Sequence, residues 1–119
     1  MTIDDFINMI GRAETAGAAN EHDRLWAIGD GGLAGGFYQM HWAWRRDYWE
    51  EVDWLLLEVM DRYALRRFIA RHPDMTARQL ASTYNLGHSA VDPAYSVRCL
   101  RALAALSIPV NEFDGPVKD

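Results

Sequence analysis

Residues Ala27 to Met40 read AIGDGGLAGGFYQM, and five of the nine glycines of the chain fall within this stretch. Because glycine lacks a Cβ atom, a run so rich in it disfavours a helix and permits tight turns and a close approach of the backbone to a ligand. We therefore predict a short β-hairpin over residues 26–40. One carboxylate, Asp30, lies among the glycines. It is either a turn residue bonded to its own backbone or a functional group held near a ligand.

The sequence before this stretch predicts an amphipathic helix over residues 1–16. Apolar side chains recur at spacings of three and four residues, which places them on one face of a helix. Thr2 is a suitable N-cap, with Asp5 as its acidic partner, and Gly17 is a suitable stop. The apolar positions are Ile3, Phe6, Ile7, Ile10 and Ala13.

The sequence after the hairpin predicts a helical region over residues 41–106. Glycine and proline are absent from residues 42–71, so we expect one long helix there, or two helices joined by a kink. Pro73 ends this segment.

Local signals divide the remainder of the helical region into two more helices. Thr76 can cap the first of them, with Gln79 in the capping-box position, and Gly87 suits its end. Asp92 followed by Pro93 is a start signal for a last helix, since proline at the first helical position lacks only a donor that has no helical partner.

The length and composition predict one domain, over residues 1–119. Half of the 119 residues are apolar, which is enough for one core and too little for two ordinary domains. The tail, residues 107–119, is expected to be loose. The predicted fold class is mainly α, of the α+β kind, with one small glycine-rich hairpin after the first helix.

The charge and the cysteine count disfavour several functional classes. A net charge of −5 argues against a nonspecific nucleic-acid surface. Cys99 is the only cysteine, which excludes an internal disulfide, and the four histidines lack the close pairing of a zinc helix. We therefore expect no metal and no cofactor. A cluster of arginines is interpreted as solvated helix surface, with a polyanion contact as the alternative. Its members are Arg62, Arg66, Arg67, Arg71 and Arg78.

The termini and the apolar runs suggest where the protein is made. No apolar run approaches the length of a membrane span, and the first residues carry acids where a secretory signal has lysine or arginine. We expect a protein made in the cytoplasm without a signal peptide and with no membrane contact. A monomer is the default expectation.

Glu14 stands in an unusual place for a charged side chain. It continues the apolar stripe of the first helix at a spacing of four and seven residues from Ile10 and Ile7, in the last helical turn. Partial burial and the carbonyl end of the helix both disfavour a negative charge, so both raise the pKa of this carboxyl group. A carboxylic acid that keeps its proton near neutrality can protonate a glycosidic oxygen. The alternative is that Glu14 points to solvent at a frayed helix end.

Four fragments in this order resemble the lysozyme-like superfamily of peptidoglycan-cleaving enzymes. They are ETAG from Glu14, AIGDGG from Ala27, GGFYQM from Gly35 and WAWRRDYW from Trp42. The similarity is greatest to the invertebrate-type (destabilase-like) lysozymes and their phage muralytic relatives, and looser to the soluble lytic transglycosylases. Tyr84, Asn85 and Gly87 match an Asn-Gly element farther along the family pattern, although Leu86 interrupts it.

The resemblance implies a muramidase with Glu14 as general acid and the glycan strands of peptidoglycan as substrate. The second carboxylate would be Asp30, or else Asp23; a lytic transglycosylase would use Glu14 alone. Hydrogen bonds to the substrate are expected from Gln39, and contacts to an N-acetyl group from the tyrosine and asparagine of the Asn-Gly element. Tyr38 and Trp42 are expected to offer aromatic faces to sugar rings, while most other aromatics fill the core.

Functions of other classes fit the same sequence. Residues 76–91 resemble a DNA-binding helix-turn-helix. However, its second helix would have to run through Asp92 and Pro93, and proline inside a helix costs about 3 kcal/mol. A wall-binding domain without catalysis is the third interpretation. The expected place of action is the bacterial cell wall, reached after release by a holin-type pore or with a virion; nucleic acid is not the expected partner.

Overall fold

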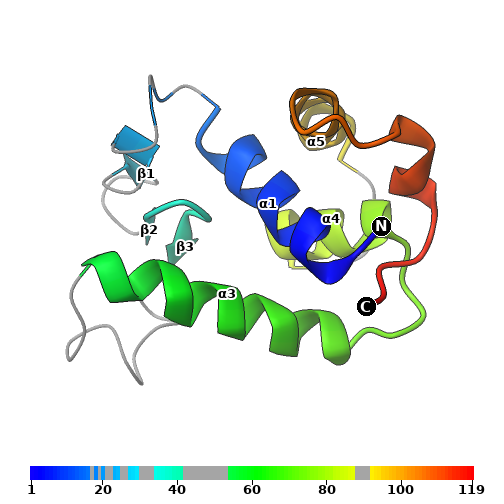
Figure 1. Ribbon diagram of the computed structural model, residues 1–119, viewed down its shortest axis with the longest axis horizontal. Helices are drawn as coiled ribbons and strands as arrows, with labels where there is room; N and C mark the ends of the chain where they lie inside the picture. The colour runs from blue at the N-terminus through cyan, green and yellow to red at the C-terminus, as the bar shows by residue number, and fades with distance from the viewer. Residues whose placement is uncertain are drawn as a thin grey trace.

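The computed structural model describes residues 1–16, 18, 20, 23–24, 27–29, 34–41, 54–87 and 92–119, with residues 54 and 55 described by their backbone alone. Within these residues the chain is mainly helical and carries one small antiparallel sheet, as predicted (Figure 1). The helices are α1 (Ile3–Glu14), α3 (Trp54–Ala70), α4 (Ala77–Leu86), α5 (Pro93–Ala105) and the 3-10 helix η3 (Val110–Asp114). The strands are β1 (Ile28–Gly29), β2 (Ala34–Gly35) and β3 (Met40–His41).

Helix α1 begins and ends close to the predicted residues. The side chain of Thr2 accepts a 3.0 Å hydrogen bond from the backbone N–H of Asp5, which confirms the N-cap. At the other end Thr15 is the C-cap, and its hydroxyl donates to the carbonyl of Gly11 at 2.6 Å. The predicted stop, Gly17, lies outside the described residues.

The sheet is a meander in the order β1-β2-β3, so the prediction of a single hairpin was incomplete. Gly35 of β2 pairs with Ile28 on one side and with Met40 on the other. The additional turn that adds β3 uses positive φ angles at Gly36 (85°) and Gln39 (47°). Glycine adopts such angles freely, whereas a residue with a Cβ atom does so at a cost.

The predicted caps of α4 and α5 are confirmed. Thr76 and Gln79 form both hydrogen bonds of a capping box, and Gly87 ends α4 in the left-handed conformation with φ 80°. The carboxylate of Asp92 accepts the first backbone N–H groups of α5, which places Pro93 at the first helical position. Helix α3 occupies only the second part of the long helix predicted after the hairpin, and residues 42–53 lie outside the described ranges.

The tail is packed against the domain, and the prediction that residues 107–119 are loose was wrong. Phe113 is fully buried and Val117 is 9% exposed. The N-terminal amino group donates to the carbonyl of Pro116 at 3.1 Å, and the backbone N–H of Lys118 donates to the carbonyl of Met1 at 3.1 Å. The tail therefore supplies apolar surface to the core and pairs its backbone with the start of the chain.

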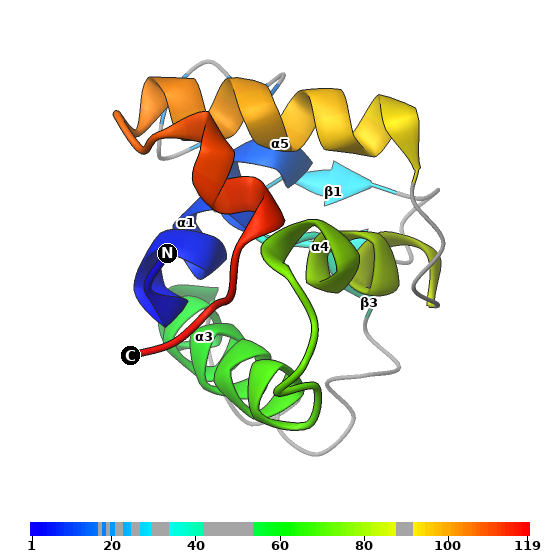
Figure 2. The same ribbon diagram turned by 90° about the vertical axis from the view of Figure 1, so that its right-hand side faces the viewer.

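Helix α1 lies between α3 and α5 and packs most extensively against α5 (Figures 1 and 2). One cluster of buried side chains joins α1 to the turn before β3, to the other helices and to the tail. The members of α1 with no exposed surface are Phe6, Ile7, Met9, Ile10 and Ala13. None of the helices in the described ranges is both long and apolar enough to cross a membrane.

Candidate functional site

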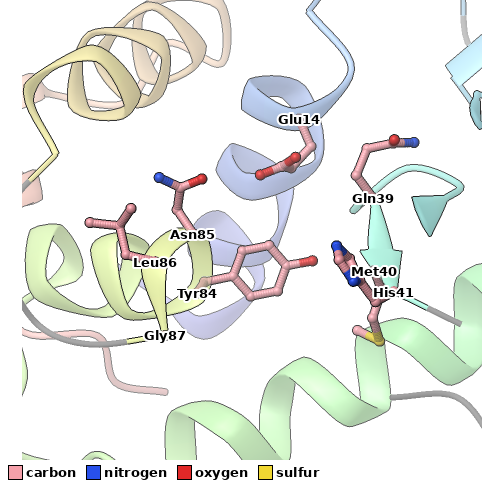
Figure 3. Close-up of a pocket in the computed structure, with 8 residues that line it drawn as sticks. All are labelled: Glu14, Gln39, Met40, His41, Tyr84, Asn85, Leu86 and Gly87. Carbon is pink, nitrogen blue, oxygen red and sulfur yellow. The ribbon is translucent and has the colours of Figure 1, made fainter. Parts of the chain in front are cut away.

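A pocket of about 280 Å³ opens where the end of α1 meets β3 and the end of α4 (Figure 3). Its walls come from three segments that are distant in the sequence. The described lining residues are Glu14, Gln39, Met40, His41, Tyr84, Asn85, Leu86 and Gly87. Four of the predicted site residues, Glu14, Gln39, Tyr84 and Asn85, thus meet around one cavity. Its volume is close to the lower end of the range for small-molecule sites, about 300 to 1,000 Å³.

Glu14 is the last residue of α1, and its half-buried side chain lines this pocket. The hydroxyl of Tyr95 donates a 2.7 Å hydrogen bond to Oε1 of Glu14. Tyr95 is only 3% exposed, and burial, followed by the charge of Glu14, raises the pKa of Tyr95 well above its usual value. The phenol therefore remains a neutral donor. This bond favours the ionised carboxylate, whereas the helix end and partial burial disfavour it.

The turn that carries Glu14 is fixed to α5 by a further side chain, and a buried thiol of α5 lies within the influence of the charge of Glu14. The guanidinium of Arg98 donates to the backbone carbonyl of Ala13 and lies 5.6 Å from the ring of Tyr95. Cys99 is fully buried, and burial, followed by the charge of Glu14, raises the pKa of its thiol to about 12. The thiol thus stays protonated beside the carboxylate, and the position of Glu14 is set by α5.

Gln39 lines the pocket from the sheet, in a backbone conformation that few side chains adopt. Its Nε2 donates to the carbonyls of Ala27 at 3.0 Å and Gly36 at 2.8 Å. Its Oε1 lies over Gly29, where an added Cβ atom would be only 2.2 Å away. The glycine of the first strand is therefore required for the placement of Gln39, and this amide braces the sheet at the edge of the pocket.

Tyr84 and Asn85 bring the end of α4 to the same cavity. The hydroxyl of Tyr84, which is 9% exposed, donates to the backbone carbonyl of Tyr38. The amide of Asn85 donates to the carboxylate of Asp92 at 2.9 Å, and its side chain is exposed. Both residues thus line the pocket while connecting α4 to its neighbours.

Tyr38 does not line the pocket, which corrects its predicted role in stacking against sugar. It is 2% exposed, and its hydroxyl donates to Oε1 of Glu58 at 2.7 Å and accepts from Arg62 at 3.0 Å. Burial, followed by the bond to Glu58, raises the pKa of Tyr38. The ring lies in the core and offers no face to the Glu14 pocket.

The second carboxylate expected from the sequence is not found among the described lining residues, where Glu14 is the sole acid. Asp23 is exposed, its backbone N–H donates to the side chain of Asn20, and it does not line the pocket. Asp30 and Trp42 lie outside the described residues.

The sequence interpretation missed Tyr95 and His41. Tyr95 is 81 residues from Glu14 along the chain, and no local pattern indicates their contact. His41 is half-buried and lines the pocket two residues after Gln39. Its position directly after the glycine-rich stretch was the only signal available for it.

Within the described ranges, no group of three or more histidine, cysteine or acidic side chains could hold a metal ion.

The arginine cluster and the segment after α4 bear on the predicted alternative of a DNA-binding helix-turn-helix. Arg62 and Arg66 both bond to Asp4, and Arg78 pairs with Asp114 at 2.7 Å, so these positive charges are partly neutralised. The helix after α4 begins at Pro93, and residues 88–91 of the predicted motif lie outside the described residues.

No known protein-family model matches this chain, and neither the curated proteins nor the solved structures contain a significant match to it. The functional argument therefore depends on the pocket and on the residues that line it.

Proposed function

We propose that this protein is a lysozyme-like enzyme that cleaves the glycan strands of bacterial peptidoglycan, with Glu14 as general acid. The observation that carries the proposal is the position of Glu14, a half-buried carboxylate at a helix end, bonded to Tyr95 and facing a pocket. Asn85 offers the oxygen of its amide group on another wall of that pocket, as a polar substituent of an amino sugar requires.

Glu14 performs the proton transfer in the proposed reaction. The protonated carboxyl group gives its proton to the oxygen that links two amino sugars, and the bond from that oxygen to the anomeric carbon breaks. The sugar ring carries the positive charge that develops. Water then adds its hydroxide to the anomeric carbon, and its proton returns to Glu14. Tyr95 holds the carboxylate in position throughout.

Glycan cleavage by a lytic transglycosylase is the second candidate. It is favoured by Glu14 being the sole carboxylate among the described residues of the pocket wall. In that reaction a hydroxyl of the same sugar, instead of water, attacks the anomeric carbon, and Glu14 takes up the proton of that hydroxyl. Mass spectrometry of the released fragments distinguishes the two, because hydrolysis yields reducing ends and transglycosylation yields anhydro sugars.

The decisive experiment is the clearing of purified peptidoglycan by the Glu14→Gln variant. Loss of a general acid reduces the rate by about 10²- to 10⁴-fold, whereas the fold should persist because glutamine still accepts the bond from Tyr95. Glu112→Gln is the matched control, because that carboxylate lies 3.9 Å from the N-terminal amino group and not in the pocket. Undiminished clearing by Glu14→Gln would eliminate the proposed acid. A wild-type protein that binds the wall without cutting it would favour a non-catalytic wall-binding domain.

A further inference from the structure

A second pocket, of about 240 Å³, is lined by the last turn of α1, the residues that follow it and α5. Four arginines line it: Arg12, Arg24, Arg98 and Arg101. The rest of its described wall consists of Thr15 and small alanine side chains, and includes no acidic residue. This concentration of positive charge occurs in a protein with a net charge of −5. We call this cavity the arginine pocket.

Two of these arginines are held in place by other residues. Arg98 donates to the backbone carbonyl of Ala13, as described above. Nε of Arg24 donates to the hydroxyl of Thr15 at 2.8 Å, and its guanidinium lies 4.8 Å from the ring centre of Phe37. A ligand would therefore meet two guanidinium groups that are already positioned, so less conformational entropy is lost on binding.

The other two arginines, Arg12 and Arg101, are exposed, and neither is joined by a hydrogen bond or an ion pair to any residue in the described part of the chain. Elsewhere in the described part of the chain Arg66 pairs with Asp4 and Arg78 with Asp114, whereas Arg67 and Arg71 have no carboxylate partner among the described residues. Like charges gathered around one cavity repel each other, and an anion in the cavity removes that repulsion.

We propose that the arginine pocket binds a phosphate-bearing anion. Guanidinium groups form two parallel hydrogen bonds with phosphate, and a phosphate monoester offers three acceptor oxygens with a charge of about −1.5 to −2. A carboxylate, like a single phosphodiester, has two free oxygens and one charge, so several guanidinium groups are matched by a phosphate monoester, by pyrophosphate or by consecutive phosphates of a polymer. The carbonyl end of α1 alone would repel an anion, but Arg98 caps the carbonyl of Ala13 there and offsets this effect.

The arginine pocket adjoins the Glu14 pocket through the same helix end. Thr15 follows Glu14 in the sequence, and Arg98 follows Tyr95 by one turn of α5. In an enzyme that cuts wall glycan, the phosphate would come from a phosphodiester-linked polymer attached to the strand being cut. This assignment of the source rests on the proposed function, whereas the phosphate site itself does not.

Calorimetric titration of the full chain with sodium pyrophosphate, at constant ionic strength, tests the site. Removing Arg12 and Arg101 together, as alanines, should weaken binding about tenfold or more. The matched control removes Arg67 and Arg71, which are equally exposed, carry the same charge and do not line the pocket. Equal losses in both double variants would show a general charge effect and overturn the proposal, as would absence of pyrophosphate binding by the wild type.

Further titrations identify the source of the phosphate. Polyglycerol phosphate that competes with pyrophosphate supports a wall polymer, whereas binding of pyrophosphate alone indicates a small phosphorylated ligand; both outcomes support the site. The proposal would be overturned if duplex DNA bound more tightly than pyrophosphate and polyglycerol phosphate, and if removing Arg67 and Arg71 weakened that binding as much as removing Arg12 and Arg101. The Glu14→Gln variant should keep its affinity for pyrophosphate, so failure of the proposed catalysis and failure of the arginine pocket are separate results.

Discussion

The hydrogen bond from Tyr95 to Glu14 should contribute to the stability of the fold. Tyr95→Phe removes the donor of this 2.7 Å bond and leaves the buried ring in place. An intramolecular hydrogen bond contributes about 0.5–1.5 kcal/mol to stability, and about 1.5–3 kcal/mol where one partner is charged. The free energy of unfolding should therefore fall by about 0.5–3 kcal/mol.

Urea unfolding of Tyr95→Phe and the wild type at neutral pH measures this difference. Tyr84→Phe is the matched control, because its hydroxyl donates to the backbone carbonyl of Tyr38 and not to Glu14. An unchanged free energy of unfolding in Tyr95→Phe would refute the reasoning.

The same substitution should slow glycan cleavage. Without the donor, the carboxyl group of Glu14 loses the hydrogen bond that positions it at the pocket. A misplaced catalytic group can cost up to about 10²-fold in rate, so the clearing of purified peptidoglycan should be slower in Tyr95→Phe. Equal clearing by Tyr95→Phe and the wild type would show that Tyr95 does not position the acid.

Three further outcomes are expected. Thr76→Ala, which breaks the capping box with Gln79, should lower the free energy of unfolding by about 1 kcal/mol in urea titrations. Gly29→Ala places a Cβ atom 2.2 Å from Oε1 of Gln39, so it should displace that side chain. The free energy of unfolding should fall by about 1–3 kcal/mol because Gln39 loses its hydrogen bonds, and the clearing of peptidoglycan should decrease. Cys99, with its thiol pKa raised to about 12 by burial and then by the nearby carboxylate, should react with thiol reagents only as fast as the protein opens.

Local signals in the sequence were sufficient for the starts of α1, α4 and α5 and for the end of α4. Thr2, Thr76 and Asp92 accept backbone N–H groups only two or three residues away, and Gly87 ends α4 by its own conformation. Such interactions lie within one helical turn, so the sequence itself contains both partners. The position of Glu14 on the apolar stripe followed from helical spacing in the same way.

Long-range packing decided which residues surround Glu14. Tyr95 reaches it from α5, while Tyr38, expected in the pocket, is drawn into the core by the area its ring can bury there. The tail is packed against the domain because Phe113 buries its ring in the core, where its apolar surface is removed from water. None of these contacts leaves a periodic or spacing signal in the chain.

The sequence by itself thus determined the N-caps of α1, α4 and α5, the end of α4 and the carboxylate in the last turn of α1. Only the tertiary structure decided that Gln39 lines the same pocket as that carboxylate, that Tyr95 bonds to it and that four arginines share a second pocket. The physical reason is the range of the interactions: a cap or a turn is satisfied within a few residues, whereas a pocket forms only when distant elements bury their apolar faces against one another.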